Sequence, residues 1–217
     1  MLFRSMTAAA IATIDELSGG RATLALGAGG GLNSYGIDRP HPVQALRETI
    51  QIVRGLTAGE TMTYAGTQFS LNGAHLDFDP VRPVPIYLAA RGPKILALAG
   101  EAADGVIIGG FAQPGGIGFA QRMVEQGLER SGRSWADVDQ MSWLYISASD
   151  DRAAARTAVS KQVLASLVTS RPILDQIGIV LPPALREHLD RTGWMYPRET
   201  AAEAAALMPD EIVDAFA

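Results

Sequence analysis

The residues most able to do chemistry form one run, Ala90-Arg91-Gly92-Pro93-Lys94, between a short apolar segment and a segment of helical periodicity. The first backbone N–H groups of a helix have no partner within it and lie at the positive end of its dipole, so such a corner suits an anion. Gly92 lets a ligand approach the backbone, and Arg91 and Lys94 can add charge-assisted hydrogen bonds. The pattern indicates a phosphate site. The alternative is that both cations are only solvated and the glycine closes a tight turn.

This corner needs a strand before it and a helix after it, and the sequence supplies both. The apolar run at 85–90 predicts a strand. Pro93 suits a first helical turn, where its missing N–H would have no partner anyway. The helix that follows contains Gly100, which costs about 1 kcal/mol relative to alanine and favours a short helix. A second apolar run at 104–109 then predicts a parallel strand, so the corner lies at the carboxyl end of its sheet.

A second glycine-rich stretch follows the predicted strand at 22–28. The chain continues through Gly27-Ala28-Gly29 to Asn33. This run matches the first half of a dinucleotide-binding fingerprint, but its sixth position is leucine and no helix starts directly after it, which excludes a Rossmann site. The side chain of Asn33 either contacts a ligand or serves a turn.

Further periodic segments complete an α/β pattern. A fourth strand is predicted at 141–148, and residues 64–78 are typical of a short hairpin or of a loop insertion. An amphipathic helix after His41-Pro42 carries Glu48 on its polar face, so we expect Glu48 either at the surface or behind the residues of a site, supporting them. From 150 onward the chain is predicted to be helical.

Composition excludes several classes of protein. The 217 residues carry a net charge of -5, which argues against nucleic acid and anionic membranes as partners. The absence of cysteine excludes disulfides, thiolate metal sites and a cysteine nucleophile, and fits a cytoplasmic protein. The histidines are dispersed, so no metal site is predicted. No apolar run approaches the roughly 20 residues of a membrane span.

Two strings resemble luciferase-like oxidoreductases, in particular the branch related to methylenetetrahydromethanopterin reductase. They are AARGPKILALAGEAADGVIIGG at 89–110 and ATIDELSGGRATLALGAGG at 12–30. The resemblance implies coenzyme F420 as cofactor, with FMN as the alternative. It also implies a set of phosphate-side positions: Ala90, Arg91 and Gly92 in the phosphate loop, Pro93 and Lys94 opening the helix, and Ile108 and Gly109 flanking the pocket.

The same resemblance places a ring-side set at the end of the first strand. Gly27, Ala28 and Gly29 would lie under the deazaflavin ring, and Asn33 would hydrogen-bond the cofactor. Gly30 stands where relatives that oxidise sugar phosphates carry a catalytic glutamate, which counts against that substrate class.

The implied fold is a partial TIM-type (β/α)8 barrel, with about four parallel strands (the family's fourth to seventh) and a C-terminal helical segment, in one domain spanning 1–217. The first three strands and the last would be missing, together with much of the catalytic wall, so no catalytic residue is assigned. Unpaired edges at 22–28 and 141–148 favour a homo-oligomer.

The implied function is a flavin- or F420-dependent oxidoreductase that passes hydride between the reduced cofactor and a small organic substrate. Two alternatives stay open. One is a truncated fragment that binds the cofactor without turnover, and the other is an unrelated α/β protein with a different phosphate ligand.

Overall fold

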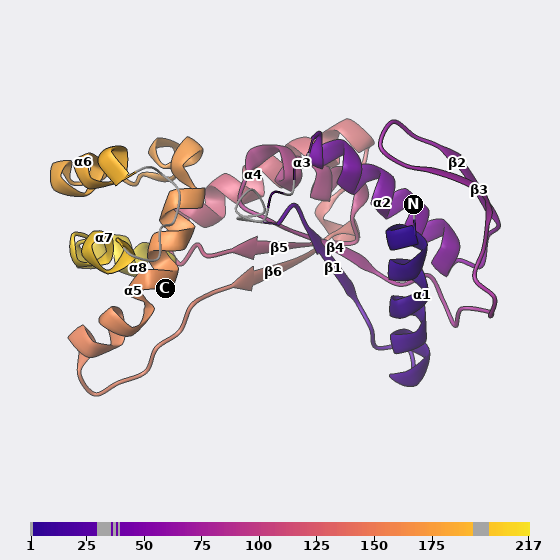
Figure 1. Ribbon diagram of the computed structural model, residues 1–217, viewed down its shortest axis with the longest axis horizontal. Coiled ribbons are helices and arrows are strands. Elements are labelled where there is room, and N and C mark those ends of the chain that lie inside the picture. Colours follow the sequence, from indigo (N-terminus) through magenta and orange to yellow (C-terminus); the bar gives the residue numbers. More distant parts are fainter. Residues whose placement is uncertain (1, 30–35, 37, 39, 193–199) are drawn as a thin grey trace. The chain divides into compact units, whose positions relative to one another are not determined.

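The computed structural model describes residues 2–29, 36, 38, 40–192 and 200–217 (Figure 1). Its main sheet has four parallel strands in the order β1-β4-β5-β6. These strands are β1 (Leu24–Gly27), β4 (Ile86–Ala90), β5 (Gly105–Gly109) and β6 (Asp139–Trp143). A hairpin forms a second sheet from β2 (Met62–Ala65) and β3 (Ser70–Ala74). The predicted strands near 22–28, 85–90 and 104–109 are confirmed. A hairpin is also confirmed, but its strands run from Met62 to Ala74 rather than over 64–78.

Helices precede β1, lie between successive strands of the main sheet and make up much of the chain after β6. They are α1 (Leu2–Leu17), α2 (Pro42–Thr57), α3 (Pro93–Ala102), α4 (Pro114–Ser131), α5 (Arg152–Thr169), α6 (Pro183–Thr192), α7 (Ala201–Ala206) and α8 (Asp210–Phe216). In the described ranges, no helix is both long enough and apolar enough to cross a membrane.

The prediction of a strand at 141–148 is wrong at both ends, because β6 runs from Asp139 to Trp143. The Gly110 N–H donates to the Trp143 carbonyl at 2.7 Å, whereas the Ala112 N–H donates to Ala215 in α8 at 2.9 Å. The segment after β5 therefore turns from β6 to a helix, and the ladder stops.

Contacts divide the chain into two compact units, and the division falls inside β5 and β6. The first unit comprises Met1–Ile107 with Met123–Gln140, and the second comprises Ile108–Arg122 with Met141–Ala217. That 1–217 is a single domain stays a prediction. The strands β1 and β6 do lie at the edges of the main sheet, and association through those edges also stays a prediction.

In the first unit, the two faces of β1 and β4 differ sharply. The strands pair in parallel, with Leu26 opposite Leu88 and Gly27 opposite Ala89. Leu88 is fully buried beneath α3, which packs on β4, and α2 packs in turn on α3. Gly27 and Ala89, on the other face, are exposed. The helices therefore cover one face and leave the other open.

In the same unit, α3 and α4 meet where each carries a glycine. A Cβ built on Gly100 would lie 2.1 Å from the Val124 carbonyl oxygen, and one built on Gly127 would lie 1.9 Å from that of Ala97. No side chain fits at such distances, so the two backbones touch. Gly100, predicted to weaken its helix, is required by this crossing.

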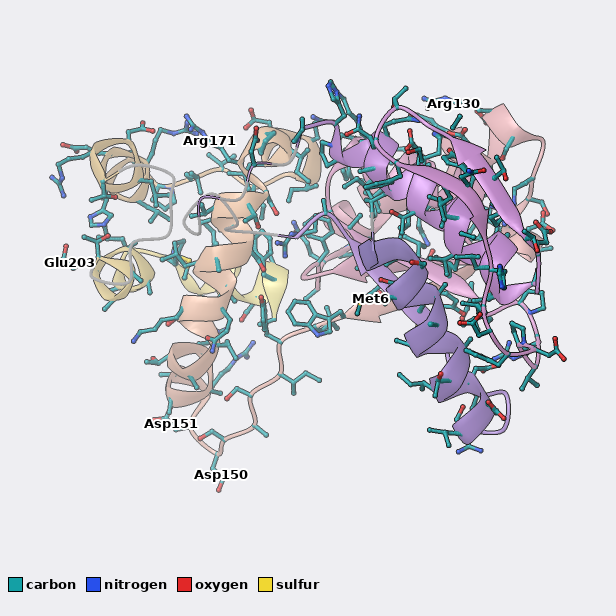
Figure 2. The ribbon with its side chains drawn as sticks, turned by 45° about the vertical axis from the view of Figure 1, so that its right-hand side comes forward. Met6, Arg130, Asp150, Asp151, Arg171 and Glu203 are labelled. Atoms are coloured by element: carbon teal, nitrogen blue, oxygen red, sulfur yellow. The ribbon has the colours of Figure 1, made fainter. Side chains whose placement is uncertain are left out.

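The second unit is held by a mixed set of contacts. The rings of Phe111 and Phe216 lie 6.0 Å apart. Arg156 in α5 donates to Asp214 in α8 at 2.8 Å from Nε, which ties the two helices together. Asp151, labelled before α5 in Figure 2, accepts the Ala153 N–H at 2.9 Å and caps the helix.

Candidate functional site

The corner between β4 and α3 has the geometry that the sequence predicts. The strand ends at Ala90, the helix begins at Pro93, and Gly92 is its N-cap with φ −76° and ψ 144°. No side chain caps the helix at this position. A Cβ built on Gly92 would meet no atom within 4 Å. The start of α3 is therefore open to an anion from outside the chain.

The two cations predicted beside this corner differ in exposure. Arg91 is half-buried and Lys94 is exposed. Lys94 also lines a cavity of about 570 Å³ between α2, α3 and α4, together with Arg130, which lies in the last turn of α4 (Figure 2). Arg47 and Glu101 form a bidentate ion pair in the same lining, with one N–O distance of 2.8 Å. The side chain of Lys94 therefore lies at the cavity between these three helices.

The glycine stretch after β1 reaches the same edge of the sheet. Since Gly27 is paired with Ala89 in a parallel register, both lie at the carboxyl ends of their strands. A Cβ built on Gly27 would lie 3.4 Å from the Ala89 carbonyl oxygen. Gly29 has φ 74°, which favours glycine. The structure therefore brings the Gly27–Gly29 stretch to the edge that ends in Ala90. Asn33 and Gly30 lie outside the described residues.

A cavity of about 310 Å³ opens at the carboxyl end of β1, between that strand, α2 and the β2–β3 turn. Most of its lining side chains are apolar. The residues that line it are Leu26, Gly27, Ala28, Asp38, Pro40, Pro42, Ala45, Leu46, Thr49, Gln68 and Phe69. The sequence predicts Gly27 and Ala28 as site residues but misses Gln68 and Phe69, because nothing in a hairpin pattern shows what its turn will face.

Of the two positions expected for Glu48, the one at the surface is wrong, because the residue is fully buried. That Glu48 supports residues of a site stays a prediction. Its carboxylate accepts the backbone N–H groups of Thr67 at 2.8 Å, Gln68 at 3.0 Å and Phe69 at 2.8 Å. It also accepts a hydrogen bond from Gln44 Nε2 at 2.9 Å. Burial alone would raise the pKa of Glu48, but these hydrogen bonds outweigh it and lower the pKa to about 2.

In the sequence, Gly66 is the residue that could have indicated that this carboxylate is buried. A Cβ built on Gly66 would lie 2.4 Å from Glu48 Oε2 and 2.5 Å from the Tyr64 ring. A glycine inside a hairpin pattern marks a close approach to the backbone. The partner, about twenty residues away, could not be read from the pattern.

The residues predicted to flank the pocket from β5 belong to the second unit. Ile108 is fully buried, so neither its side chain nor its backbone is exposed in this structure. Gly109 is half-buried, and a Cβ built on it would lie 3.7 Å from the Trp143 ring. Their flanking role stays a prediction.

Tyr87 is the titratable side chain on the open face of β4. Its hydroxyl donates to Asp139 Oδ2 at 2.7 Å, and that hydrogen bond, with burial, raises the pKa of Tyr87. Gly105 makes room for the ring, since a Cβ there would lie 2.5 Å from it. Within the described ranges, no group of three or more histidine or acidic side chains could hold a metal ion.

Comparisons with known proteins give relatives for nearly the whole chain. Residues 5–217 match the luciferase-like monooxygenase family. A 5,10-methylenetetrahydromethanopterin reductase from Archaeoglobus fulgidus is 36% identical over 218 residues, covering 98% of this chain and 64% of that protein. An F420-dependent glucose-6-phosphate dehydrogenase from Beutenbergia cavernae is 30% identical over 219 residues, covering 96% and 62%. The chain spans a little under two thirds of the length of these relatives.

A solved structure shares the fold. The coenzyme F420-dependent tetrahydromethanopterin reductase from Methanopyrus kandleri superposes with a TM-score of 0.79 at 24% identity, covering 99% of this chain and 66% of that one. This likeness confirms the predicted fold class, a partial TIM-type (β/α)8 barrel. With the family match over residues 5–217, it shows that the chain belongs to the luciferase-like monooxygenase family.

Proposed function

We propose that this chain binds coenzyme F420 with its phosphate at the Gly92 corner, and serves hydride transfer between the reduced deazaflavin and a small organic substrate. The observation that carries the proposal is the uncapped start of α3, with open space over Gly92. F420 is favoured over FMN because the Beutenbergia cavernae and Methanopyrus kandleri relatives are F420-dependent.

The residues at the carboxyl edge fit an anionic cofactor. Ala90, Arg91 and Gly92 would hold the phosphate through backbone N–H groups and the guanidinium. Gly27 and Ala28, at the end of the neighbouring strand, would lie against the ring and leave room for it. The bound cofactor would supply the hydride chemistry, whereas the chain binds and orients it and keeps water from the reacting face.

Binding without turnover is the second candidate, and a specific observation favours it. Tyr87 is the single titratable residue in β1 and β4, and its hydroxyl already donates to Asp139. These two strands therefore offer little acid–base chemistry of their own.

The substitution Gly92→Asp tests the proposal. Fluorescence titration with F420 should show a dissociation constant raised at least tenfold, because the new carboxylate repels the phosphate and occupies its space. The variant should fold as well as the wild type, since no atom lies near the new Cβ and aspartate is a favourable N-cap.

Ala136→Asp, which adds the same charge at an exposed residue, is the control. Unchanged F420 affinity in Gly92→Asp removes the corner from the site. A wild-type chain that binds neither F420 nor FMN overturns the proposal. Hydride transfer to an acceptor by the F420-bound chain separates turnover from binding alone.

A further inference from the structure

The turn between β2 and β3 forms one wall of the 310 Å³ cavity at the end of β1. Gln68 and Phe69, both half-buried, line that cavity together with Gly27 and Ala28. A short segment of the hairpin is thereby brought to the residues assigned to the ring of the cofactor.

The position of this wall is set by α2 rather than by the hairpin alone. Glu48, in the second turn of α2, accepts consecutive N–H groups from Thr67 to Phe69 at 2.8–3.0 Å, and the Thr67 hydroxyl at 2.9 Å. Two of those groups belong to the residues whose side chains line the cavity. The Glu48 carboxylate therefore holds the backbone from which both side chains project, and a binding wall held in this way loses little freedom when a ligand binds.

The lining defines the chemistry of a ligand. Phe69, Leu26 and Leu46 offer apolar surface, and Gln68 adds an amide that can both donate and accept. The other polar side chains of the lining are Thr49, whose hydroxyl donates to the Ala45 carbonyl, and Asp38, which is exposed. A volume of about 310 Å³ lies at the lower end of the range for small-molecule pockets. A planar ring system with polar edges suits this combination, because an aromatic side chain packs on its face and an amide reaches its rim.

We propose that Gln68 and Phe69 contact the ring system of the bound cofactor, and that Glu48 is the positioning residue that holds them there. The inference rests on the proposed function for the identity of the ligand, and it adds a specificity wall that the resemblance to the family did not supply.

Fluorescence titration with F420 tests the wall. Phe69→Ala should raise the dissociation constant about tenfold, through lost contact with the ring, and Gln68→Ala about fivefold. Asn72→Ala, an exposed residue of the same hairpin that does not line the cavity, is the matched control and should leave affinity unchanged. Thermal unfolding of each variant checks that the hairpin still folds.

A double-mutant cycle tests the role of Glu48. Glu48→Gln should raise the F420 dissociation constant, and adding Phe69→Ala to it should raise that constant less than twofold further, because the wall is already displaced. If Glu48 only stabilised the fold, the melting temperature would fall and the two effects on affinity would multiply.

The outcomes separate this inference from the proposed function. If Gly92→Asp abolishes F420 binding while Phe69→Ala and Gln68→Ala bind as the wild type does, the wall is wrong and the proposed function stands. If the two wall variants weaken binding while Gly92→Asp does not, the wall stands and the phosphate corner is wrong. A wild-type chain that binds neither F420 nor FMN overturns both.

Discussion

Two glycine-containing turns of the first unit treat the same chemical group in opposite ways. In the β2–β3 turn, three consecutive backbone N–H groups point at the carboxylate of Glu48, and a Cβ on Gly66 would lie 2.4 Å from it. At the start of α3, no side chain caps the helix and a Cβ on Gly92 would touch nothing. One turn carries its own anion, and the other leaves room for one from outside.

This difference shows what distinguishes a turn that can bind a ligand from a turn that has only a structural role. Backbone N–H groups attract an anion in either place. Where the chain supplies the carboxylate, the groups are satisfied, the turn is held in place and no ligand can bind. Where it does not, the same attraction is available to a ligand. The comparison predicts that changes at the first turn alter stability and that changes at the second alter affinity.

Glu48→Ala should have the largest effect on stability. Removing a buried charged acceptor leaves its backbone donors without a partner and opens a cavity, at a cost of about 2–4 kcal/mol of unfolding free energy. Urea unfolding of the variant and the wild type measures this cost. Glu125→Ala, at an exposed position on α4, is the control and should change stability by less than about 0.5 kcal/mol. A loss of less than about 1 kcal/mol of unfolding free energy in Glu48→Ala would contradict the conclusion that Glu48 holds the β2–β3 turn.

The next largest effect should come from acid, which weakens the hydrogen bonds that Glu48 accepts from the β2–β3 turn. The pKa of Glu48 is lowered from 4.5 to about 2 in the folded chain, so its stabilisation is fully present above about pH 4.5 and is lost as the pH falls toward 2. Urea midpoints measured between pH 7 and pH 2 should therefore fall less steeply in Glu48→Gln, which lacks this titration. Parallel curves for the two proteins would show that Glu48 is not the group responsible.

Replacing Gly66 and Gly92 by serine should have the smallest effects, but it compares the two turns most directly. Gly66→Ser must displace Glu48 or Tyr64 and should cost about 1–3 kcal/mol. Gly92→Ser places a favourable N-cap residue in open space and should change stability by less than about 0.5 kcal/mol. Equal losses in the two variants would mean that the turns do not differ as described.

Much of the fold could be predicted from local patterns. The strands β4 and β5 could be predicted because each is a short, largely apolar run bounded by glycine or proline. The corner before α3 could be predicted from Gly92 and Pro93, because the preference of these residues for a helix start does not depend on a distant partner. The spacing of Ser134 and Asp137 is another local pattern, that of a capping box, and the two residues form one at the start of the short helical turn Trp135–Asp137.

What the sequence could not show depends on partners distant along the chain. The sequence could not decide between a surface and a supporting position for Glu48, because its donors lie about twenty residues away, in a hairpin whose turn faces inward. The end of β6 depends on where the segment after β5 turns toward α8. Gln68 and Phe69 enter the candidate site for the same reason as Glu48, since only the folded hairpin shows what they face.

The contact between α3 and α4 has a consequence for the corner proposed to bind a phosphate, which lies at the first turn of α3. Gly92 and Gly100 are eight residues apart, or about 12 Å along a helix axis. Any side chain introduced at Gly100 or Gly127 would have to push α3 away from its neighbour, and the rigid helix would carry that displacement to its first turn. If the proposed function holds, substitutions at this helix crossing should therefore alter affinity from a distance.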